Sequence, residues 1–584
     1  MQADPLESRA DTAFWPVLAC FFLSGFAALL YEIVWLRQFS IVLGTSELAV
    51  ATVLAAYMAG LAVGAAVAAR FVGRMRRPIL AYGLLEAGIA LSALAVPLGL
   101  SLVRMLQVAL LGGQPGPPDA GGVGTAIFYL AGAFAVVMVP TALMGATLPL
   151  LTRHAVRRGE QIGGRTGLLY AVNTGGAVLG TLTAAFVLLP RVGLAATVWV
   201  GVAINGLVFV IAALIARGKE TEVEDKEPAT GDSKREAERA ASKRQRPRKK
   251  GRDRAAARTL GKATAAQESS VEARGGWVLP LMLLSGAVSF TYEVLWTRLL
   301  GHVLGGSLFA FATMLASFLT GITLGSAIAS RLARSRQWAA AGLIASQLGI
   351  ALLSILVYSL LDDLPGMARR LGAGEQAGLL ANAAIASLVL LPATLCIGAT
   401  FPFAVRLAAR DPSDAGPAAA RVYAFNTVGA IAGAILAGFI IIPDFGFAGT
   451  AIMAVAASAL LAVLACLLWP SQSWRLLLPV GGSALLILTL FRPDPPDAIL
   501  RASPFGGPAG TGRVVFSSVG RSATVLVLEQ DGVFDLRTNG LPEARIAPHG
   551  KPPGYERNQR WLTALPVLAR AGSPSPGSQT GRSA

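Results

Sequence analysis

The feature of this sequence that most constrains its fold is an internal duplication. Residues 24–37 read Ser-Gly-Phe-Ala-Ala-Leu-Leu-Tyr-Glu-Ile-Val-Trp-Leu-Arg. Residues 285–298 read Ser-Gly-Ala-Val-Ser-Phe-Thr-Tyr-Glu-Val-Leu-Trp-Thr-Arg, at an offset of 261 residues. The same offset relates Gly44 to Gly305 without a gap. A repeat of this kind predicts two related structural units in one chain.

A second shared segment lies later in each unit. The pattern Gly-Ala-Thr-x-Pro occupies residues 145–149 and 398–402, at an offset of 253 residues. This offset continues to further matched pairs, which are Tyr170 and Tyr423, Asn173 and Asn426, Gly180 and Gly433, and Pro190 and Pro443. The smaller offset means that the second unit is shorter between its two shared segments.

Composition places both units in a membrane. The chain has 584 residues, of which 54% are hydrophobic and 14% are charged, and its mean hydropathy is +0.60. Soluble domains carry about 25% charged residues. Apolar runs of about 20 residues, the length that crosses a bilayer, recur along the chain. The sequence therefore predicts an all-α polytopic membrane protein.

The apolar runs predict six membrane spans in each unit. In the first unit they cover 14–36, 47–72, 79–103, 124–151, 167–189 and 193–215. In the second they cover 277–299, 308–332, 339–361, 379–407, 422–442 and 450–468. We assign the units to 1–216 and 277–470. Two six-span units in the same orientation are the arrangement of major-facilitator-type transporters.

Arginine residues set the predicted orientation. They gather in the loops after the second and fourth spans of each unit, whereas the odd loops of the first unit are poor in Lys and Arg. By the positive-inside rule the even loops and the N-terminus are cytoplasmic. The first run has no Ala-x-Ala cleavage site, so we expect it to be retained as a span. The net charge of +17 is explained by these loops better than by nucleic-acid binding.

Residues 217–276 form a predicted linker between the units. The segment begins acidic, becomes strongly basic at 243–250, and contains no aromatic residue and only one Val before Leu260. We expect a disordered cytoplasmic tether. Binding of anionic lipid or nucleic acid by the basic run is the alternative.

The chain changes character after the second unit. Residues 471–492 form one more apolar run, which either spans the membrane or lies at its surface, and this choice decides the side on which the tail lies. Residues 493–570 predict a small β-domain, with a hairpin of 521–528 and 533–537. Asp-Gly at 531–532 and Asn-Gly at 539–540 are turn signals. A short helix is predicted at 558–566, and a disordered tail at 571–584.

Three repeated segments resemble bacterial membrane proteins described as fused major-facilitator/spermidine synthases. They are the paired Ser-Gly…Tyr-Glu-x-x-Trp-x-Arg, Gly-Ala-Thr-x-Pro and Tyr-Ala-x-Asn-Thr-x-Gly-Ala segments. The resemblance covers nearly the whole chain except the linker and the last residues. The tail hairpin is similar to the small N-terminal β-domain of the synthase part. The resemblance implies aminopropyl transfer from decarboxylated S-adenosylmethionine to a polyamine.

That chemistry needs a Rossmann-like domain with a Gly-rich turn, an acid for the cofactor ribose and a catalytic Asp. None of these follows residue 568 in this sequence. We therefore expect no cofactor and no catalytic residue here, with the synthase part truncated or lost. The expected consequence is that the 584-residue chain makes no spermidine.

Glu32 and Glu293 are the main candidate functional residues, because a carboxylate inside a span is costly and usually faces a partner or the bundle interior. Two such carboxylates could bind a small cationic substrate such as a polyamine. The alternative is a structural anchor that fixes the depth of each span through Glu, Arg and Trp. The full candidate set for substrate binding is Glu32, Glu293, Arg37, Arg298, Tyr31, Tyr292, Asn173 and Asn426. Both asparagines could instead join helices by hydrogen bonds.

Small residues and prolines in the spans have structural interpretations. The Gly-x-x-x-Gly pairs at 60 and 64, 321 and 325, 176 and 180, and 429 and 433 predict close helix packing. Pro140, Pro149, Pro392 and Pro402 predict kinks in the fourth spans. The cysteines and histidines lack metal-ligand spacing, so no metal is expected.

Three functions remain open from the sequence. The chain is a membrane protein of the spermidine-synthase-like family without its catalytic part, a transporter or binding protein for a small cation, or a non-catalytic membrane scaffold. The expected partners are the lipid bilayer and a small cation, and no nucleic acid.

Overall fold

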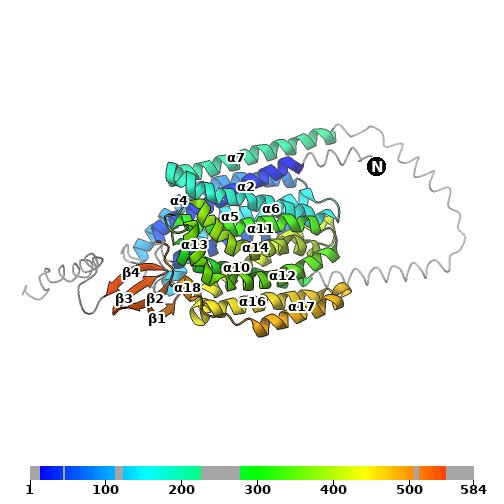
Figure 1. The fold of residues 1–584 in the computed structure, drawn as a ribbon. Coiled ribbons are helices and arrows are strands. Elements are labelled where there is room, and N and C mark those ends of the chain that lie inside the picture. The colour runs from blue at the N-terminus through cyan, green and yellow to red at the C-terminus, as the bar shows by residue number, and fades with distance from the viewer. Residues whose placement is uncertain are drawn as a thin grey trace, which may run out of the picture.

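Long apolar helices make up most of the structure, a computed structural model that describes residues 14–43, 47–111, 123–224, 276–505, 512–521 and 523–546. The helices run side by side in one bundle, with a small sheet at one end (Figure 1). The first unit contains α2 (Phe14–Leu43), α3 (Glu47–Phe71), α4 (Pro78–Leu111), α5 (Val123–Ala155), α6 (Gln161–Thr183) and α7 (Leu189–Glu224). The second contains α10 (Val278–Leu304), α11 (Leu308–Leu332), α12 (Arg336–Ser359), α14 (Leu379–Ala408), α15 (Ala415–Leu436) and α16 (Ile442–Leu468).

Within the described residues, ten segments are long and apolar enough to cross a membrane. Two of them, Gln161–Arg217 and Pro412–Leu468, have 57 residues each. A straight helix of that length would measure about 85 Å, far beyond the roughly 30 Å of hydrocarbon. Each of these two segments holds two of the helices above and therefore two predicted spans. The twelve predicted spans thus all correspond to helices.

The chain reverses at equivalent glycines in the two long segments. Gly193 has φ 76° and Gly446 has φ 68°, at the offset of 253 residues. This left-handed conformation is easily adopted only by glycine. A π-helical turn precedes each reversal, at η2 (Ala184–Leu188) and η5 (Ala437–Ile441). Pro190 and Pro443 follow these turns and lack the N–H that would continue the α-helical pattern.

The two units pack against each other with two-fold pseudosymmetry. Helix α3 contacts α15, and α11 contacts α6. Since α11 is the equivalent of α3 and α15 is the equivalent of α6, the two contacts are the same interface made twice. The duplication seen in the sequence is therefore also the symmetry that joins the two halves of the bundle.

Glycines allow the closest helix approaches inside each half. A Cβ added at Gly60 or Gly64 of α3 would overlap Thr141 or Ala142 of α5. The equivalent Gly321 and Gly325 of α11 stand in the same relation to α14. The Gly-x-x-x-Gly pairs of α6 and α15 pack in the same way on α2 and α10. The predicted close packing is confirmed, and it is symmetric.

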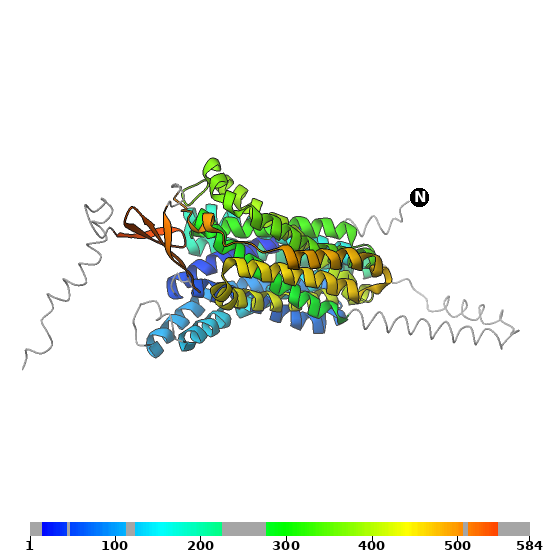
Figure 2. The same cartoon turned by 60° about the horizontal axis from the view of Figure 1, so that its bottom comes forward.

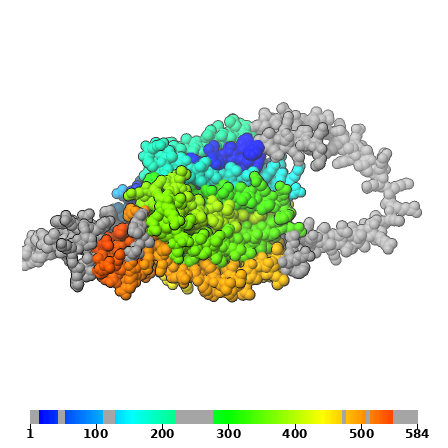
Figure 3. Space-filling view, viewed as in Figure 1, coloured from blue at the N-terminus to red at the C-terminus, as the bar shows by residue number. Residues whose placement is uncertain are grey.

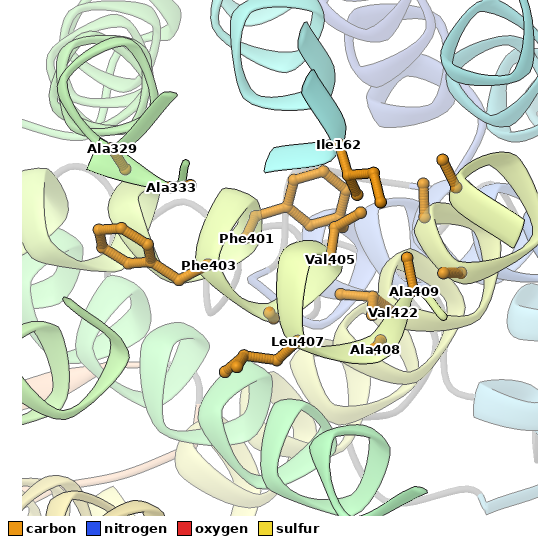
Figure 4. Packing of buried hydrophobic residues seen from close by; sticks show 14 of the residues in the cluster. Ile162, Ala329, Ala333, Phe401, Phe403, Val405, Leu407, Ala408, Ala409 and Val422 are labelled. Carbon is orange, nitrogen blue, oxygen red and sulfur yellow. The ribbon is translucent and has the colours of Figure 1, made fainter. Parts of the chain in front are cut away.

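One buried cluster joins both halves at the end of the bundle that carries the arginine-rich loops. It contains Ile162 of α6, Ala333 of α11 and Val405 of α14. Figure 4 places Ile162 among Phe401, Val405 and other residues of the cluster. At the opposite end the buried residues divide into two clusters, one centred in each half, and the first turns of α11 contribute to both.

Helix α17 (Pro470–Leu490) packs beside α16 and leads to the end opposite the arginine-rich loops. Short helices α13 (Leu364–Leu371) and α18 (Asp497–Leu500) lie at this end. The sheet lies there too, as Figures 1 and 2 agree, and Figure 3 shows it against the end of the bundle. Within the described residues the apolar part of α17, Leu476–Leu490, is shorter than the ten segments that are long enough to cross a membrane, so a thirteenth span stays a prediction.

The sheet has four antiparallel strands in chain order. They are β1 (Arg513–Val519), β2 (Thr524–Gln530), β3 (Val533–Thr538) and β4 (Leu541–Ile546). The predicted hairpin corresponds to β2 and β3, while β1 is not predicted. Both predicted turns form with positive φ, 53° and 76° at Asp531 and Gly532, and 51° and 80° at Asn539 and Gly540. The predicted helix at 558–566 lies outside the described residues, as do the last residues of the chain.

Several helices extend beyond the predicted spans. Helix α2 continues to Leu43, α4 to Leu111 and α7 to Glu224, which is inside the predicted linker. A helix can continue past the hydrocarbon layer, so apolarity marks the membrane-crossing part and not the helix end. The rest of the linker lies outside the described residues. The four prolines lie inside α5 and α14, and the helices continue through them.

Candidate functional site

The duplicated Tyr-Glu-x-x-Trp motif lies in the middle of α2 and of α10. Tyr31 stacks on Trp35 with ring centroids 5.2 Å apart, because residues four apart share a helix face. In the second half Tyr292 stacks on Trp296 at 6.4 Å. All four rings are buried. These tyrosines and tryptophans therefore pack inside each half.

The carboxylates of the same motif come together between the halves. Glu32 is 9% exposed and Glu293 is partly buried, and the two interact electrostatically across the pseudo-two-fold axis. The Oε2 atom of Glu293 is inaccessible to solvent and has no hydrogen-bond partner among the described residues. Within the described chain no Lys, Arg or His forms an ion pair with either carboxylate. The pair is thus two acids without a counter-charge.

One tyrosine from each half interacts electrostatically with Glu32. These are Tyr57 of α3 and Tyr423 of α15. Tyr170 of α6 lies 4.6 Å from the ring of Phe401, which is 6.3 Å from Tyr423. Two tyrosines thus interact with Glu32, and no cationic side chain in the described residues pairs with either carboxylate.

The two arginines of the motif do not neutralise the carboxylates. The Arg298 guanidinium donates from Nη1 to the backbone carbonyl of Gly520 at 3.0 Å, and from Nη2 to that of Arg521. Arg37 is exposed. The sequence prediction grouped both arginines with the glutamates, but Arg298 is committed to the sheet.

Asn173 joins two helices. Its Nδ2 donates to the backbone carbonyl of Phe21 on α2 at 3.0 Å. The backbone of Asn173 also lies against Gly25, as the backbone of Asn426 lies against Gly286 in the second half. The position of both asparagines at tight helix contacts fits the structural alternative better than ligand binding.

A second buried acid, Glu86, was missed by the sequence analysis. It lies in α4 and is fully buried. Ser24 Oγ donates to its Oε1 and Asn205 Nδ2 donates to its Oε2, each at 2.5 Å. Tyr31 Oη donates to Asn205 Oδ1 at 2.9 Å. The signal was present in the sequence, because Glu86 is a lone acid inside the predicted span 79–103.

The fold and these sites define a multi-pass membrane protein of the transporter type, built from two related six-helix halves. A sequence model of the Major Facilitator Superfamily matches residues 10–374, which is more than half of the chain. The chain therefore belongs to the Major Facilitator Superfamily. No curated protein matches it.

Two solved transporter structures are similar to the chain. One is a Major Facilitator Superfamily transporter, FucP, in the outward conformation, with 13% identity and a TM-score of 0.43, covering 78% of this chain and 98% of that one. The other is the human organic anion transporter MFSD10 (TETRAN), with 12% identity and a TM-score of 0.44, covering 77% of this chain and 99% of that one.

Proposed function

We propose that this protein transports a small organic cation, with a polyamine as the substrate class, and that Glu32 and Glu293 bind it between the two halves. The proposal rests on Glu32 and Glu293, which interact across the pseudo-two-fold axis and form no ion pair with a basic residue of the described chain. A single charged acid inside a bilayer costs about 3 kcal/mol on insertion scales. Two acids that also repel each other favour a ligand that supplies positive charge.

The number and placement of the charges favour a ligand with more than one amine. Each half contributes one carboxylate, so a diamine or longer polyamine can pair with both at once. Tyr57 and Tyr423 interact with Glu32, so their rings are the aromatic groups placed to contact a cation held there. An anionic ligand would add a third negative charge and is disfavoured.

The same placement suits transport. A ligand held by one carboxylate from each half contacts both bodies that move relative to each other in alternating access. The contacts of α3 with α15 and of α11 with α6 are the equivalent surfaces about which such rocking would occur. We propose the bacterial inner membrane as the location, with the arginine-rich loops and the N-terminus in the cytoplasm.

The comparisons support the transporter alternative and give no support to the synthase part of the resemblance. The matched family is a transporter family. In the described part of the tail, the only sheet is the small antiparallel one. Aminopropyl transfer therefore does not enter the proposal.

Uptake by the purified protein in proteoliposomes tests the proposal. We expect uptake of labelled spermidine, competition by other polyamines, and no competition by organic anions. Glu32→Gln and Glu293→Gln should each reduce uptake strongly. Asp531→Asn is the matched control, because this acid is exposed in a sheet turn whose positive φ asparagine tolerates. Uptake that is absent in the wild type, or equal in all four proteins, would refute the proposal.

A further inference from the structure

Glu86 is a buried acid that the proposed substrate site does not use. It lies inside the first half, where α2, α4 and α7 meet, and its hydrogen bonds come from Ser24 of α2 and Asn205 of α7. No Lys, Arg or His pairs with it in the described chain. A carboxylate in this position must be held by neutral donors alone, or carry a proton.

The second half contains a natural neutral version of the same junction. The repeat offset of 261 relates Ser24 to Ser285 and Glu86 to Gln347. Gln347 Nε2 donates to Ser285 Oγ at 2.7 Å, and both residues are buried. An uncharged side chain of the length of glutamate therefore fits at this helix junction. The two halves differ in that only the first has a group there that can bind a proton.

Both protonation states of Glu86 fit its surroundings. The ionised carboxylate accepts hydrogen bonds from Ser24 and Asn205 at its two oxygens. The protonated acid has one O–H and can donate to Ser24 Oγ, as the amide of Gln347 does to Ser285. Switching between the two states needs only rotation of the Ser24 hydroxyl group. The site can therefore hold or release a proton without repacking.

A hydrogen-bond chain connects this acid to the substrate-binding motif. Tyr31 Oη donates to Asn205, which donates to Glu86. Tyr31 directly precedes Glu32 in α2, and Ser24 lies in the same helix. A change in the charge of Glu86 therefore acts on α2 at two points. One of them is adjacent to the proposed substrate carboxylate.

We propose that Glu86 is the proton-binding site that couples cation transport to a proton gradient; the coupling rests on the proposed function, whereas proton binding does not. Release breaks the O–H bond of the acid, and the proton passes to water on one side of the membrane. Uptake of a proton from the other side restores the bond. Because Gln347 cannot titrate, the first half alone carries this role.

The other titratable groups around Glu86 are weak acids. Cys20 and Tyr31 of α2 and Tyr82 of α4 interact with it electrostatically. The basic residues of α5, Arg153 and His154, are in its last turn. Helix α7 presents Asn205 to the site, and its charged residues lie toward its two ends. Among these titratable groups, Glu86 is the only carboxyl group.

Two readouts test the proposal with wild type, Glu86→Gln and Glu86→Asp in proteoliposomes. The first is the infrared band of the protonated carboxyl group, followed from low to high pH without substrate. The second is spermidine uptake with and without an imposed pH gradient. Glu86→Gln copies Gln347 and should fold, while Glu86→Asp keeps a titratable group. Sample homogeneity and thermal stability check folding.

We expect the infrared spectrum of Glu86→Gln to lack one carboxyl band that titrates in the wild type. We also expect this variant to take up spermidine at the same rate with and without the pH gradient. Glu86→Asp should keep both a band and a gradient response. An unchanged band in Glu86→Gln, a full gradient response in that variant, or wild-type uptake that follows a sodium gradient instead would each overturn the proposal. If wild type takes up no spermidine, the proposed function and the coupling fail together, and the infrared result still decides proton binding.

Discussion

The guanidinium of Arg298 binds the backbone carbonyl of Gly520, 222 residues later in the chain. This contact ties α10 to the turn between β1 and β2. A second tie lies nearby, where a Cβ added at Gly540 would be 3.0 Å from the backbone oxygen of His302. The sheet is therefore held by the helix that carries Glu293.

We predict that Arg298→Ala loosens the sheet from the bundle. The guanidinium supplies hydrogen bonds to two carbonyl groups, and a bond that involves a charged group contributes about 1.5–3 kcal/mol. Limited proteolysis should then release the tail faster than in wild type. Arg37→Ala is the matched control, because Arg37 is the repeat equivalent and is exposed. Equal cleavage in both variants would contradict the assignment.

Close helix packing predicts a second effect. Gly64→Ala and Gly325→Ala place a Cβ against backbone of the neighbouring helix, and overpacking of this kind costs about 1–3 kcal/mol. Both variants should therefore melt at lower temperature in detergent. Gly206→Ala in α7 meets nothing within 4 Å and should melt at or above the wild-type temperature. Equal melting temperatures of the three variants would contradict the close helix contacts at Gly64 and Gly325.

Asn173 should matter for stability and not for affinity. Asn173→Ala removes the hydrogen bond to the Phe21 carbonyl, and such bonds in membrane proteins contribute about 0.6–1.7 kcal/mol. We expect a lower melting temperature with unchanged spermidine affinity. A lower spermidine affinity with an unchanged melting temperature would indicate instead that Asn173 binds the substrate.

The two ends of the bundle should lie on opposite sides of the membrane. We predict that a membrane-impermeant maleimide added to intact cells labels Ser518→Cys in β1 and not Arg157→Cys in an arginine-rich loop. Both positions are exposed. The three native cysteines are replaced by alanine in this experiment. Labelling of Arg157→Cys and not of Ser518→Cys would indicate the opposite orientation in the membrane.

Much of the fold could be predicted from sequence because its signals are local or repeated. Apolar runs located the twelve helices, and the glycine pairs located their closest contacts. The Asp-Gly turn located strands β2 and β3, and the Asn-Gly signal located the turn that follows them. Strands β1 and β4 were not predicted, and neither was helix α13. The strands are held by pairing with β2 and β3, which depends on neighbours and not on the segment's own sequence.

The candidate site was only partly predictable. The repeat selected Glu32 and Glu293, whose role in binding stays a prediction. It also selected Tyr31, Tyr292, Asn173 and Arg298, whose described contacts are within a half or with the sheet. Matching by repeat cannot separate a ligand-facing residue from one that packs. It also overlooks differences between the halves, and Glu86 is missed because its equivalent is Gln347.

The most direct test of the central claim is equilibrium binding of labelled spermidine to the purified protein, with Glu32→Gln, Glu293→Gln and the double variant compared in one cycle. Loss of one carboxylate should weaken binding about tenfold, which is about 1.4 kcal/mol. The double variant should weaken binding by less than the product of the two single effects, because one polyamine pairs with both acids. Wild-type affinity in the double variant would contradict the account.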